Sequence, residues 1–334
     1  MTENKMETVL SGIRSTGHLH LGNYFGALRN FVKIQDMYNC YFFIADLHSL
    51  TTHPHPDDFH ASVRTILAEY LASGLDPEKA AIYIQSDVPE ISELYVLLNM
   101  IAYKGELERT ASFKDKVRKN PDNVNAGLLT YPVLMASDIL IHRSDWVPVG
   151  KDQEQHLEMA RVFARRFNNM YGVEVFPEPR SMVFPGGAVK VPGLDGNGKM
   201  GKSEGNGIYL YDDEKAITKK VMKAVTDSGP TEPNSPMPVV IDNLFTIMKL
   251  VSTQDTVDYF TEKWNDCSIR YGDLKKQIAK DICSMTLPIK EKIDAIYNDE
   301  AYLSRVVKEG RDKARASASA TLAEVKKAVG FRAF

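Results

Sequence analysis

Two short glycine-containing motifs, far apart along the chain, limit what this protein can fold into more than any other feature. Residues 17–23 read GHLHLGN, and residues 199–203 read KMGKS. Glycine lets a ligand approach the backbone closely, and lysine can neutralise phosphate charge. Because the two motifs are far apart in the sequence, we predict that they form two sides of one nucleotide site. Such a site is completed when the chain folds and is not formed by a single loop.

The first motif lies at a predicted strand-to-helix junction. It follows an apolar run at residues 8–10 and a turn-rich stretch at 11–17, and it leads into residues 24–35, where apolar side chains recur at helical spacing. The N–H groups of a first helical turn have no partner within the helix and attract anions. His20 and Asn23, one turn apart, could place neutral donors on the same phosphates. A polar turn that only caps a helix would look the same, so this motif is weak alone.

The second motif lies in a glycine-rich stretch, residues 193–207, which predicts a mobile loop. Lys199 and Lys202 could close over a polyphosphate, although a solvated loop with two ordinary lysines has the same composition. Residues 196–203 also fit the P-loop pattern G-x-x-x-x-G-K-[ST]. That motif must open a helix, whereas residues 204–207 (EGNG) disfavour one because glycine is costly in helices. We therefore interpret the P-loop match as accidental.

Strand and helix signals alternate over the first two hundred residues. Buried strands are predicted at 41–46 and 80–85, a short strand at 146–149, and helices at 57–73, 91–103, 128–141 and 152–167. This alternation predicts an α/β fold with a parallel sheet. After Ser203 the strand signals disappear, and helices are predicted at 212–226, 239–251, 256–264, 271–297 and 300–330. A nucleotide-binding α/β domain followed by an all-helical domain is therefore expected.

Composition bounds the class of protein. Apolar residues make up 43% of the chain and charged residues 25%, as in soluble globular proteins. We expect a cytoplasmic protein, because no apolar run is long enough to span a membrane and the N-terminus lacks an apolar signal region. Cys40, Cys267 and Cys283 form no C-x-x-C pair, so neither a structural metal nor an iron–sulfur cluster is expected. Residues 270–334 carry 14 basic and 9 acidic side chains, which is compatible with nucleic-acid binding.

Taken together, the motifs resemble the class I aminoacyl-tRNA synthetases, and more narrowly the bacterial tryptophanyl-tRNA synthetases. Residues 20–23 (HLGN) resemble that family's variant of the HIGH motif, and residues 199–203 resemble its KMSKS loop. Several intervening blocks resemble this family in particular, and they occur in the right order: residues 105–116, 127–140 and 147–156, followed by 224–228 and 310–313.

The resemblance implies a Rossmann-type catalytic domain at residues 1–203 and a helical anticodon-binding domain at 204–300. It also implies that residues 301–334 form a last helix that packs back on the catalytic domain. The implied reaction has two steps: L-tryptophan and ATP, with Mg²⁺, give tryptophanyl-adenylate and pyrophosphate, and the tryptophanyl group then passes to the 3′-terminal adenosine of tRNA(Trp). A homodimer is implied as well.

The resemblance also assigns candidate site residues. Lys199, Lys202, Lys116 and His20 are expected to act in catalysis, with Lys116 reaching the phosphates from another loop. The residues expected to bind ATP are Arg14, Ser15, Thr16, Gly22, Asn23, Gly150, Lys151, Asp152, Val191, Lys199, Met200, Gly201, Lys202 and Ser203. Those expected to bind tryptophan are Asp138, Tyr131, Met135, His48, Val149 and Gln153, and Ile139 is a further pocket candidate.

Asp138 is the expected specificity residue. A buried carboxylate that accepts the indole N–H would be left unpaired by the wrong amino acid, and this penalty can discriminate strongly. From spacing alone, an Asp paired within its own helix would be the better interpretation, and the resemblance reverses that. Met135 and Ile139 are nearly as well explained as core residues.

Three positions depart from the family pattern. Gly201 stands where the KMSKS loop usually has serine, Glu204-Gly205 where many members have Asp-Pro, and Arg14 where many have glutamine, so that a positive charge could reach the α-phosphate. Three alternatives stay open: the tyrosine-specific sister enzyme, a paralogue that binds nucleotide without charging tRNA, and a nucleotidyltransferase that acts on a small cofactor.

Overall fold

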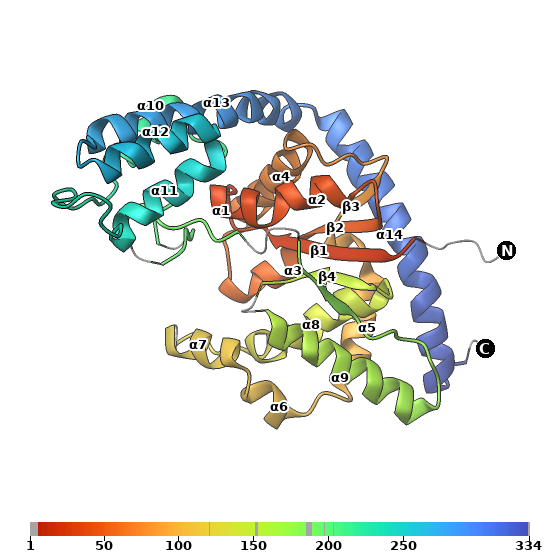
Figure 1. Cartoon of the computed structure of the whole chain (residues 1–334). Helices are drawn as coiled ribbons and strands as arrows, with labels where there is room; N and C mark the ends of the chain where they lie inside the picture. Colours follow the sequence, from red (N-terminus) through yellow and green to blue (C-terminus); the bar gives the residue numbers. More distant parts are fainter. Residues whose placement is uncertain are drawn as a thin grey trace.

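The computed structural model describes residues 6–119, 121–150, 153–184, 189–196, 198–202 and 204–332. Its centre is a five-stranded parallel sheet with the strand order β3-β2-β1-β4-β5 (Figure 1). The strands are β1 (Thr8–Arg14), β2 (Asn39–Ala45), β3 (Ala80–Ile84), β4 (Trp146–Pro148) and β5 (Arg180–Met182). Strands β2 and β3 are buried on both faces, which explains why they are nearly continuous apolar runs.

Helices cover both faces of the sheet. The chain turns from β1 through α1 (Leu21–Asn23), a π-helical turn η1 (Tyr24–Leu28) and α2 (Arg29–Ile34) before it enters β2. The remaining helical elements of the sheet region are α3 (Asp46–Ser49), the 3-10 turn η2 (Leu50–Thr52), α4 (Pro56–Ala72), the 3-10 turn η3 (Gln85–Asp87), α5 (Pro89–Asn99), α6 (Lys104–Glu108), α7 (Ala111–Lys119), α8 (Ala126–Ile141) and α9 (Glu154–Tyr171).

The strand order reverses between β1 and β4, which are neighbours in the sheet although more than a hundred residues separate them in the chain. In open parallel sheets, ligands bind beyond the carboxyl ends of the strands at such a reversal. The fold therefore places Arg14, the last residue of β1, and the segment after Pro148 beside the expected binding crevice.

The elements that follow the KMGKS segment in the described residues are all helices. Helices α10 (Glu214–Met222), α11 (Val239–Val251), α12 (Gln254–Asn265) and α13 (Tyr271–Tyr297) gather at one end of the molecule, and α13 also packs against α4 (Figure 1). Asp213 and Thr253 cap α10 and α12 with their side chains. Apolar residues of this helical group are continuous with the core on one face of the sheet.

The last helix, α14 (Glu300–Val329), returns along the sheet and packs against β3, α5 and α8 (Figure 1). At the crossing point its backbone rests directly on the edge strand, because a β-carbon at Gly310 would stand only 1.8 Å from the carbonyl oxygen of Ile82. Van der Waals contact needs about twice that separation, so this crossing requires glycine.

The predicted fold class is confirmed: a parallel sheet precedes an all-helical part. Two helices, Val239–Val251 and Tyr271–Tyr297, have the predicted bounds. The helix predicted at 91–103 is wrong in its extent, because α5 ends at Asn99 and the chain is extended again at Tyr103. The three-residue strand β5 and the short helices α6 and α7 were not predicted. No helix follows the accidental P-loop match until Glu214, within the residues that the structure describes.

Candidate active site

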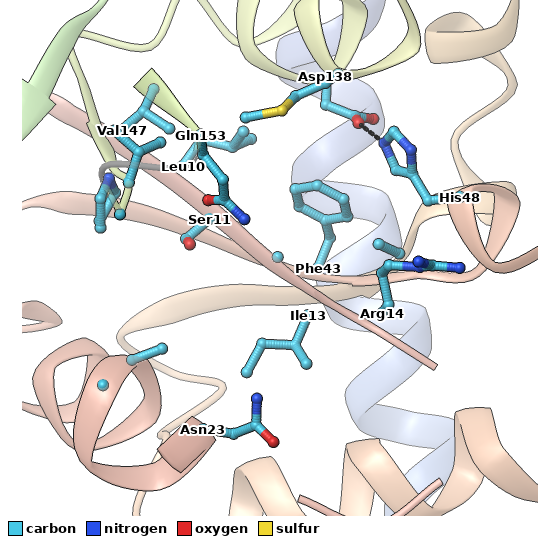
Figure 2. Close-up of a pocket in the computed structure, with 18 of the residues that line it drawn as sticks. Leu10, Ser11, Ile13, Arg14, Asn23, Phe43, His48, Asp138, Val147 and Gln153 are labelled. Carbon is cyan, nitrogen blue, oxygen red and sulfur yellow. Dashed lines mark hydrogen bonds and ion pairs between the residues drawn. The ribbon is translucent and has the colours of Figure 1, made fainter. Parts of the chain in front are cut away.

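A cavity of about 840 Å³ opens at the carboxyl ends of β1 and β4, where the strand order reverses. Figure 2 shows Asp138 and His48 at its top and Asn23 at its bottom, with Phe43 and Ile13 between them. The cavity wall includes these predicted residues: Arg14, Thr16, Asn23, His48, Tyr131, Met135, Asp138, Ile139, Val149, Gly150, Gln153 and Lys202. Folding thus brings residues of both predicted binding sets into one space.

At one end of the cavity lies the buried carboxylate of Asp138, on α8. His48 Nε2 lies 2.8 Å from its Oδ2, and Gln85 Nε2 donates to its Oδ1 at 2.7 Å (Figure 2 draws the His48 contact). Burial raises the pKa of Asp138, whereas these two partners and the charge of His48 act in the opposite direction. Each carboxylate oxygen can accept a further bond, so Asp138 can still receive an N–H from a ligand.

Gln85 was not predicted from the sequence as a residue of the site. It is fully buried directly after β3, where a polar side chain at the carboxyl end of a parallel strand is the only signal that could have identified it. Its Oε1 has no hydrogen-bond partner among the described residues. Because its amide N–H holds one oxygen of Asp138, Gln85 orients the carboxylate.

The apolar floor of the cavity was also missed. Phe43 of β2 lies across β1, where a β-carbon at Gly12 would stand 2.6 Å from the ring. Glycine at this position therefore lets an aromatic ring form the floor (Figure 2). Ser11, Met182 and Phe184 also line the cavity. In the sequence these residues could not be told from ordinary core residues of a strand.

Lys116 lies on α7 and not on a loop, which corrects the sequence-based expectation. Its ammonium stands 3.9 Å from the centroid of the Tyr131 ring, a cation–π contact. Burial lowers the pKa of Lys116 to about 8, and the charge of Arg14 adds to this effect. Lys116 therefore lies beside Tyr131 of the cavity wall, although it is not part of that wall itself.

The HLGN segment is shaped by His20, which caps α1. Its Nδ1 accepts the backbone N–H of Asn23 at 3.2 Å, and Asn23 Oδ1 accepts the backbone N–H of His20. Burial, together with the charges of Lys202 and Lys199, lowers the pKa of His20 to about 4, so the ring is neutral at pH 7. Since Nδ1 is an acceptor, Nε2 carries the remaining proton as a donor. Gly22 is required here, because a β-carbon would stand 2.8 Å from the His20 ring.

A buried glutamate supports this segment from beneath. Glu69 of α4 accepts the backbone N–H of Leu19 at 2.8 Å and pairs with His18 Nδ1 at 2.7 Å. Burial raises the pKa of Glu69, and the bonds from His18 and Leu19 and the charge of Lys202 oppose that shift. A buried charge is tolerated only when it is paired and hydrogen-bonded. Glu69 therefore fixes the backbone from which the HLGN segment starts.

The KMGKS segment meets the HLGN segment through Lys202, whose Nζ donates to the carbonyl oxygen of Gly17 at 2.7 Å. Burial lowers the pKa of Lys202 to about 8, with Glu69 opposing and Arg14 assisting this shift. Asn206 holds the segment in place: its Oδ1 accepts the N–H of Gly201 at 3.0 Å, and its Nδ2 reaches Asp195. The two motifs are therefore adjacent in the fold.

Other predicted residues lie beside the cavity rather than in its wall. Lys199 and Val191 line a second hollow of about 360 Å³ together with Asn243 and Thr246 of α11. Ser15 is buried and donates to the hydroxyl of Ser49, which braces the end of β1 against α3. Met200 is a core residue. The predicted residues Lys151, Asp152 and Ser203 lie outside the described residues.

The fold and the paired motifs define a class of protein. Residues 2–285 match the model of the family described as tRNA synthetases class I (W and Y), and the chain belongs to this family. It is therefore an aminoacyl-tRNA synthetase, a ligase of protein synthesis. No helix among the described residues is both long and apolar enough to cross a membrane.

Within this family, three relatives that are at least 34% identical to this chain are named for tryptophan. The chain is 66% identical to the tryptophan–tRNA ligase of Porphyromonas gingivalis over 98% of this chain and 100% of that protein. It is 43% identical to the tryptophan–tRNA ligase of Fusobacterium nucleatum over 97% of this chain and 98% of that protein. Tryptophanyl-tRNA synthetase from Campylobacter jejuni, solved with ADP and tryptophan, is 34% identical, with a TM-score of 0.87 over 97% of this chain and 100% of that one.

Proposed function

We propose that this protein is a tryptophan–tRNA ligase, which activates L-tryptophan with ATP and transfers it to the 3′-terminal adenosine of tRNA(Trp). The observation that carries the proposal is the continuity of the cavity. A buried carboxylate, Asp138, lies at one end, and Asn23 of the HLGN segment and Lys202 of the KMGKS segment lie in its wall. The names of the relatives favour tryptophan over tyrosine as the amino acid.

At the amino-acid end, we assign the indole to the space between Phe43, Met135 and Val149, with its N–H directed to Asp138. His48 and Gln85 hold that carboxylate by donors, which fixes where it can accept. Tyr131 and Gln153, also in the wall, are assigned to the rest of the amino acid. A phenylalanine side chain has no N–H and would leave Asp138 without its bond, so it would be rejected.

At the nucleotide end, ATP enters as its Mg²⁺ complex. We assign the phosphates to the HLGN segment, where His20 is a neutral donor, and to Lys202 and Lys116. A carboxylate oxygen of tryptophan attacks the α-phosphorus, the bond to the β-phosphate breaks, and pyrophosphate leaves. The amino acid supplies the nucleophile itself, so the enzyme contributes positioning and charge stabilisation.

The remaining predicted residues complete this assignment. Thr16, Gly22 and Gly150 are assigned to close backbone approach around ATP, and Ser15 to the support of that loop. Lys199, whose charge helps to lower the pKa of His20, is assigned to the departing pyrophosphate. Lys151, Asp152, Val191, Met200, Gly201 and Ser203 are proposed contacts of ATP on the ground of the family motif.

We further propose a division into a catalytic domain at 1–203, an anticodon-binding domain at 204–300 and a final helix at 301–334, in a cytoplasmic homodimer. Three large apolar side chains near the end of α5 support a dimer: Val96, Met100 and Tyr103 are 51%, 76% and 57% exposed. Exposed apolar groups of this kind mark interaction surfaces. Light scattering of the protein and of Met100→Glu tests this: the wild type should have the mass of two chains, and the variant should shift toward one.

The experiment that tests the function is ATP–pyrophosphate exchange with each of the twenty amino acids, without tRNA. Exchange with tryptophan alone is expected. Exchange with tyrosine would make the tyrosine-specific enzyme the answer, and no exchange with any amino acid would favour the paralogue that does not charge tRNA. Charging of a tRNA(Trp) transcript with labelled tryptophan then tests the second step.

A further inference from the structure

We propose that Lys275 is a positioning residue for the reaction: from α13 it holds the KMGKS segment in the place where that segment meets the nucleotide. Lys275 lies outside the cavity wall, so it acts through the chain that follows α10, residues 224–226, and not on a substrate. This inference rests on the proposed function and adds to it a residue that belongs to neither phosphate motif.

Lys275 keeps its ammonium inside the protein. Only 8% of the residue is exposed, and burial lowers its pKa. Its Nζ donates to the carbonyl oxygen of Ala224 at 2.8 Å and to the hydroxyl of Thr226 at 3.4 Å. Among the described residues, no carboxylate pairs with this ammonium. A buried ammonium without a counter-ion is unfavourable, whereas a methionine would fill a similar space without that penalty. The two bonds to segment 224–226 are therefore what the lysine contributes.

The bonds from Lys275 fix how the chain leaves α10. Helix α10 packs against α13, and Ala224 follows directly after its C-cap (Figure 1). A cation suits this place, because the carboxyl end of a helix carries partial negative charge. Tyr271, one turn before Lys275 on α13, donates its hydroxyl to Asp227. The first two turns of α13 thus hold residues 224–227 at both ends.

Segment 224–226 is bonded to the loop that carries the KMGKS segment. Val225 lies between the two residues that the ammonium contacts, and its backbone N–H donates to the carbonyl oxygen of Leu194 at 3.1 Å. The N–H of Leu194 donates to the carbonyl oxygen of Asn206 at 3.0 Å. The side chain of Asn206 accepts the N–H of Gly201, also at 3.0 Å. Three consecutive hydrogen bonds therefore lead from segment 224–226 to the middle of the KMGKS segment.

The same loop also rests on the helical part of the chain at Gly196. A β-carbon at this position would stand 2.9 Å from Cγ1 of Val240, on α11, and 3.9 Å from Cβ of Val225. Glycine has wide conformational freedom, so a loop rich in glycine owes its position to outside contacts more than to its own stiffness. A shift of segment 224–226 should therefore displace the loop.

Lys202 is the side chain whose position depends on these contacts. Its Nζ donates to the carbonyl oxygen of Gly17 at 2.7 Å, beside the HLGN segment. A displacement of about 1 Å can slow a reaction roughly 100-fold when it misplaces a catalytic group. The amino-acid end of the cavity has separate supports, because side chains of other elements hold Asp138. Loss of the Lys275 bonds should therefore slow adenylate formation and leave tryptophan binding unchanged.

The test compares Lys275→Met, which removes the donor, with Lys276→Met, a matched control at the exposed neighbouring residue of α13. Single-turnover adenylate formation at saturating ATP should slow roughly 10-fold in Lys275→Met. The Kd of tryptophan measured without ATP should stay within about twofold. Lys275→Arg, which restores a donor, should recover part of the rate. Lys276→Met should match the wild type in both measurements.

A double-mutant cycle with Lys202→Ala separates positioning from a general loss of structure. In the Lys202→Ala background, Lys275→Met should change the rate of adenylate formation less than about twofold, because the side chain that it positions is already absent. Two independent effects would multiply instead. Thermal melting shows whether each variant is folded at the assay temperature, and Lys275→Gln takes the place of Lys275→Met in the cycle if the latter is not.

Two results would overturn the inference. One is an unchanged rate in a folded Lys275→Met beside an active wild type. The other is the same loss of rate from Lys275→Met with and without Lys202, which would make the lysine a structural residue only. A wild type that is inactive with every amino acid would instead refute the proposed function, so the two failures are distinguishable.

Discussion

The imidazole of His18 lies flat on the ring of Tyr211, with centroids 4.6 Å apart and planes within 2°. His18 is also paired with Glu69, and the Tyr211 hydroxyl donates to Asp294 of α13 at 2.6 Å. The ammonium of Lys290 lies 4.2 Å from the centre of the same tyrosine ring. This stack therefore links the start of the HLGN segment to the helical part of the chain.

Replacement of Tyr211 should weaken ATP binding, although Tyr211 itself does not line the cavity. Tyr211→Leu removes the flat surface on which His18 rests, so we expect the KM for ATP to rise several-fold while the Kd of tryptophan is unchanged. Tyr211→Phe keeps the stack, loses only the bond to Asp294, and should have a smaller effect. Steady-state exchange kinetics measure both. Equal damage from the two substitutions would mean that the hydrogen bond matters and the stack does not.

Asp138→Asn should damage tryptophan recognition selectively. The asparagine amide presents an N–H where the carboxylate accepted a bond, so either His48 or Gln85 would face a donor. We expect kcat/KM for tryptophan to fall roughly 100-fold, with little change in the KM for ATP. Discrimination against phenylalanine should shrink, which exchange assays with both amino acids measure. An unchanged ratio of the two kcat/KM values would rule out Asp138 as the specificity residue.

Lys202→Ala should separate binding from chemistry. If Lys202 stabilises charge that develops on the phosphates, its removal should slow adenylate formation roughly 100-fold. Tryptophan binding should change much less, because the lysine lies at the nucleotide end of the cavity. Stopped-flow kinetics measure both tryptophan binding and adenylate formation. Equal losses in affinity for tryptophan and in the rate of adenylate formation would contradict this role of Lys202.

The pH dependence of ATP binding should report the protonation of Lys116 and Lys202 together. Burial lowers the pKa of each from 10.5 to about 8, so the empty site loses positive charge as the pH rises through 8. Phosphate favours the charged lysines, and ATP should therefore bind with proton uptake at pH 8 and almost none at pH 6. Calorimetry at pH 8 in phosphate and in Tris should give different binding enthalpies. Lys202→Met should reduce that difference, and identical enthalpies in the two buffers would refute the prediction.

The lowered pKa values of Lys116 and Lys202 also make the free energy of unfolding depend on pH. Between pH 8 and 10.5 the unfolded chain holds more protons on these lysines than the folded chain does, so their unfavourable contribution shrinks as the pH rises through this window. It is fully present below pH 8. Lys202→Met should therefore melt at a higher temperature than the wild type at pH 7, with a smaller gain at pH 10.

Gly310→Ala should destabilise the protein. The new β-carbon would stand 1.8 Å from the Ile82 carbonyl oxygen, so α14 must move away from β3. Such overpacking costs roughly 1–3 kcal/mol, which corresponds to a melting temperature lower by about 5 °C. Gly272→Ala is the matched control: it is also a helical glycine, but nothing lies within 4 Å of its added carbon. The control should melt at or above the wild-type temperature, and a Gly310→Ala that does the same would contradict the packing argument.

The architecture could be predicted because its signals are local. Apolar runs identified β2, β3 and β4, and helical periodicity identified α11 and α13 with their bounds. Strand β5 gave no such signal because it has only three residues, Arg180–Met182, and pairs only with β4.

The site was predictable only where a motif marks it. Asp138, Asn23 and Lys202 stand in blocks that resemble a family, and the cavity contains all three. Phe43 stands in a strand that reads as core, Gln85 directly follows such a strand, and Glu69 stands inside an ordinary helix. Their roles depend on contacts between elements distant in the chain, such as the bond from Leu19 to Glu69, and no local pattern encodes those contacts.

The seat of α14 on β3 has a consequence for synthesis of the protein. The ribosome completes all five strands before it begins the helix that covers the edge of the sheet. Until residues 300–329 have left the exit tunnel, β3 remains an open edge to which another nascent chain could pair. A chain that ends near residue 300 would carry both substrate motifs but would leave this edge open to pairing with other chains.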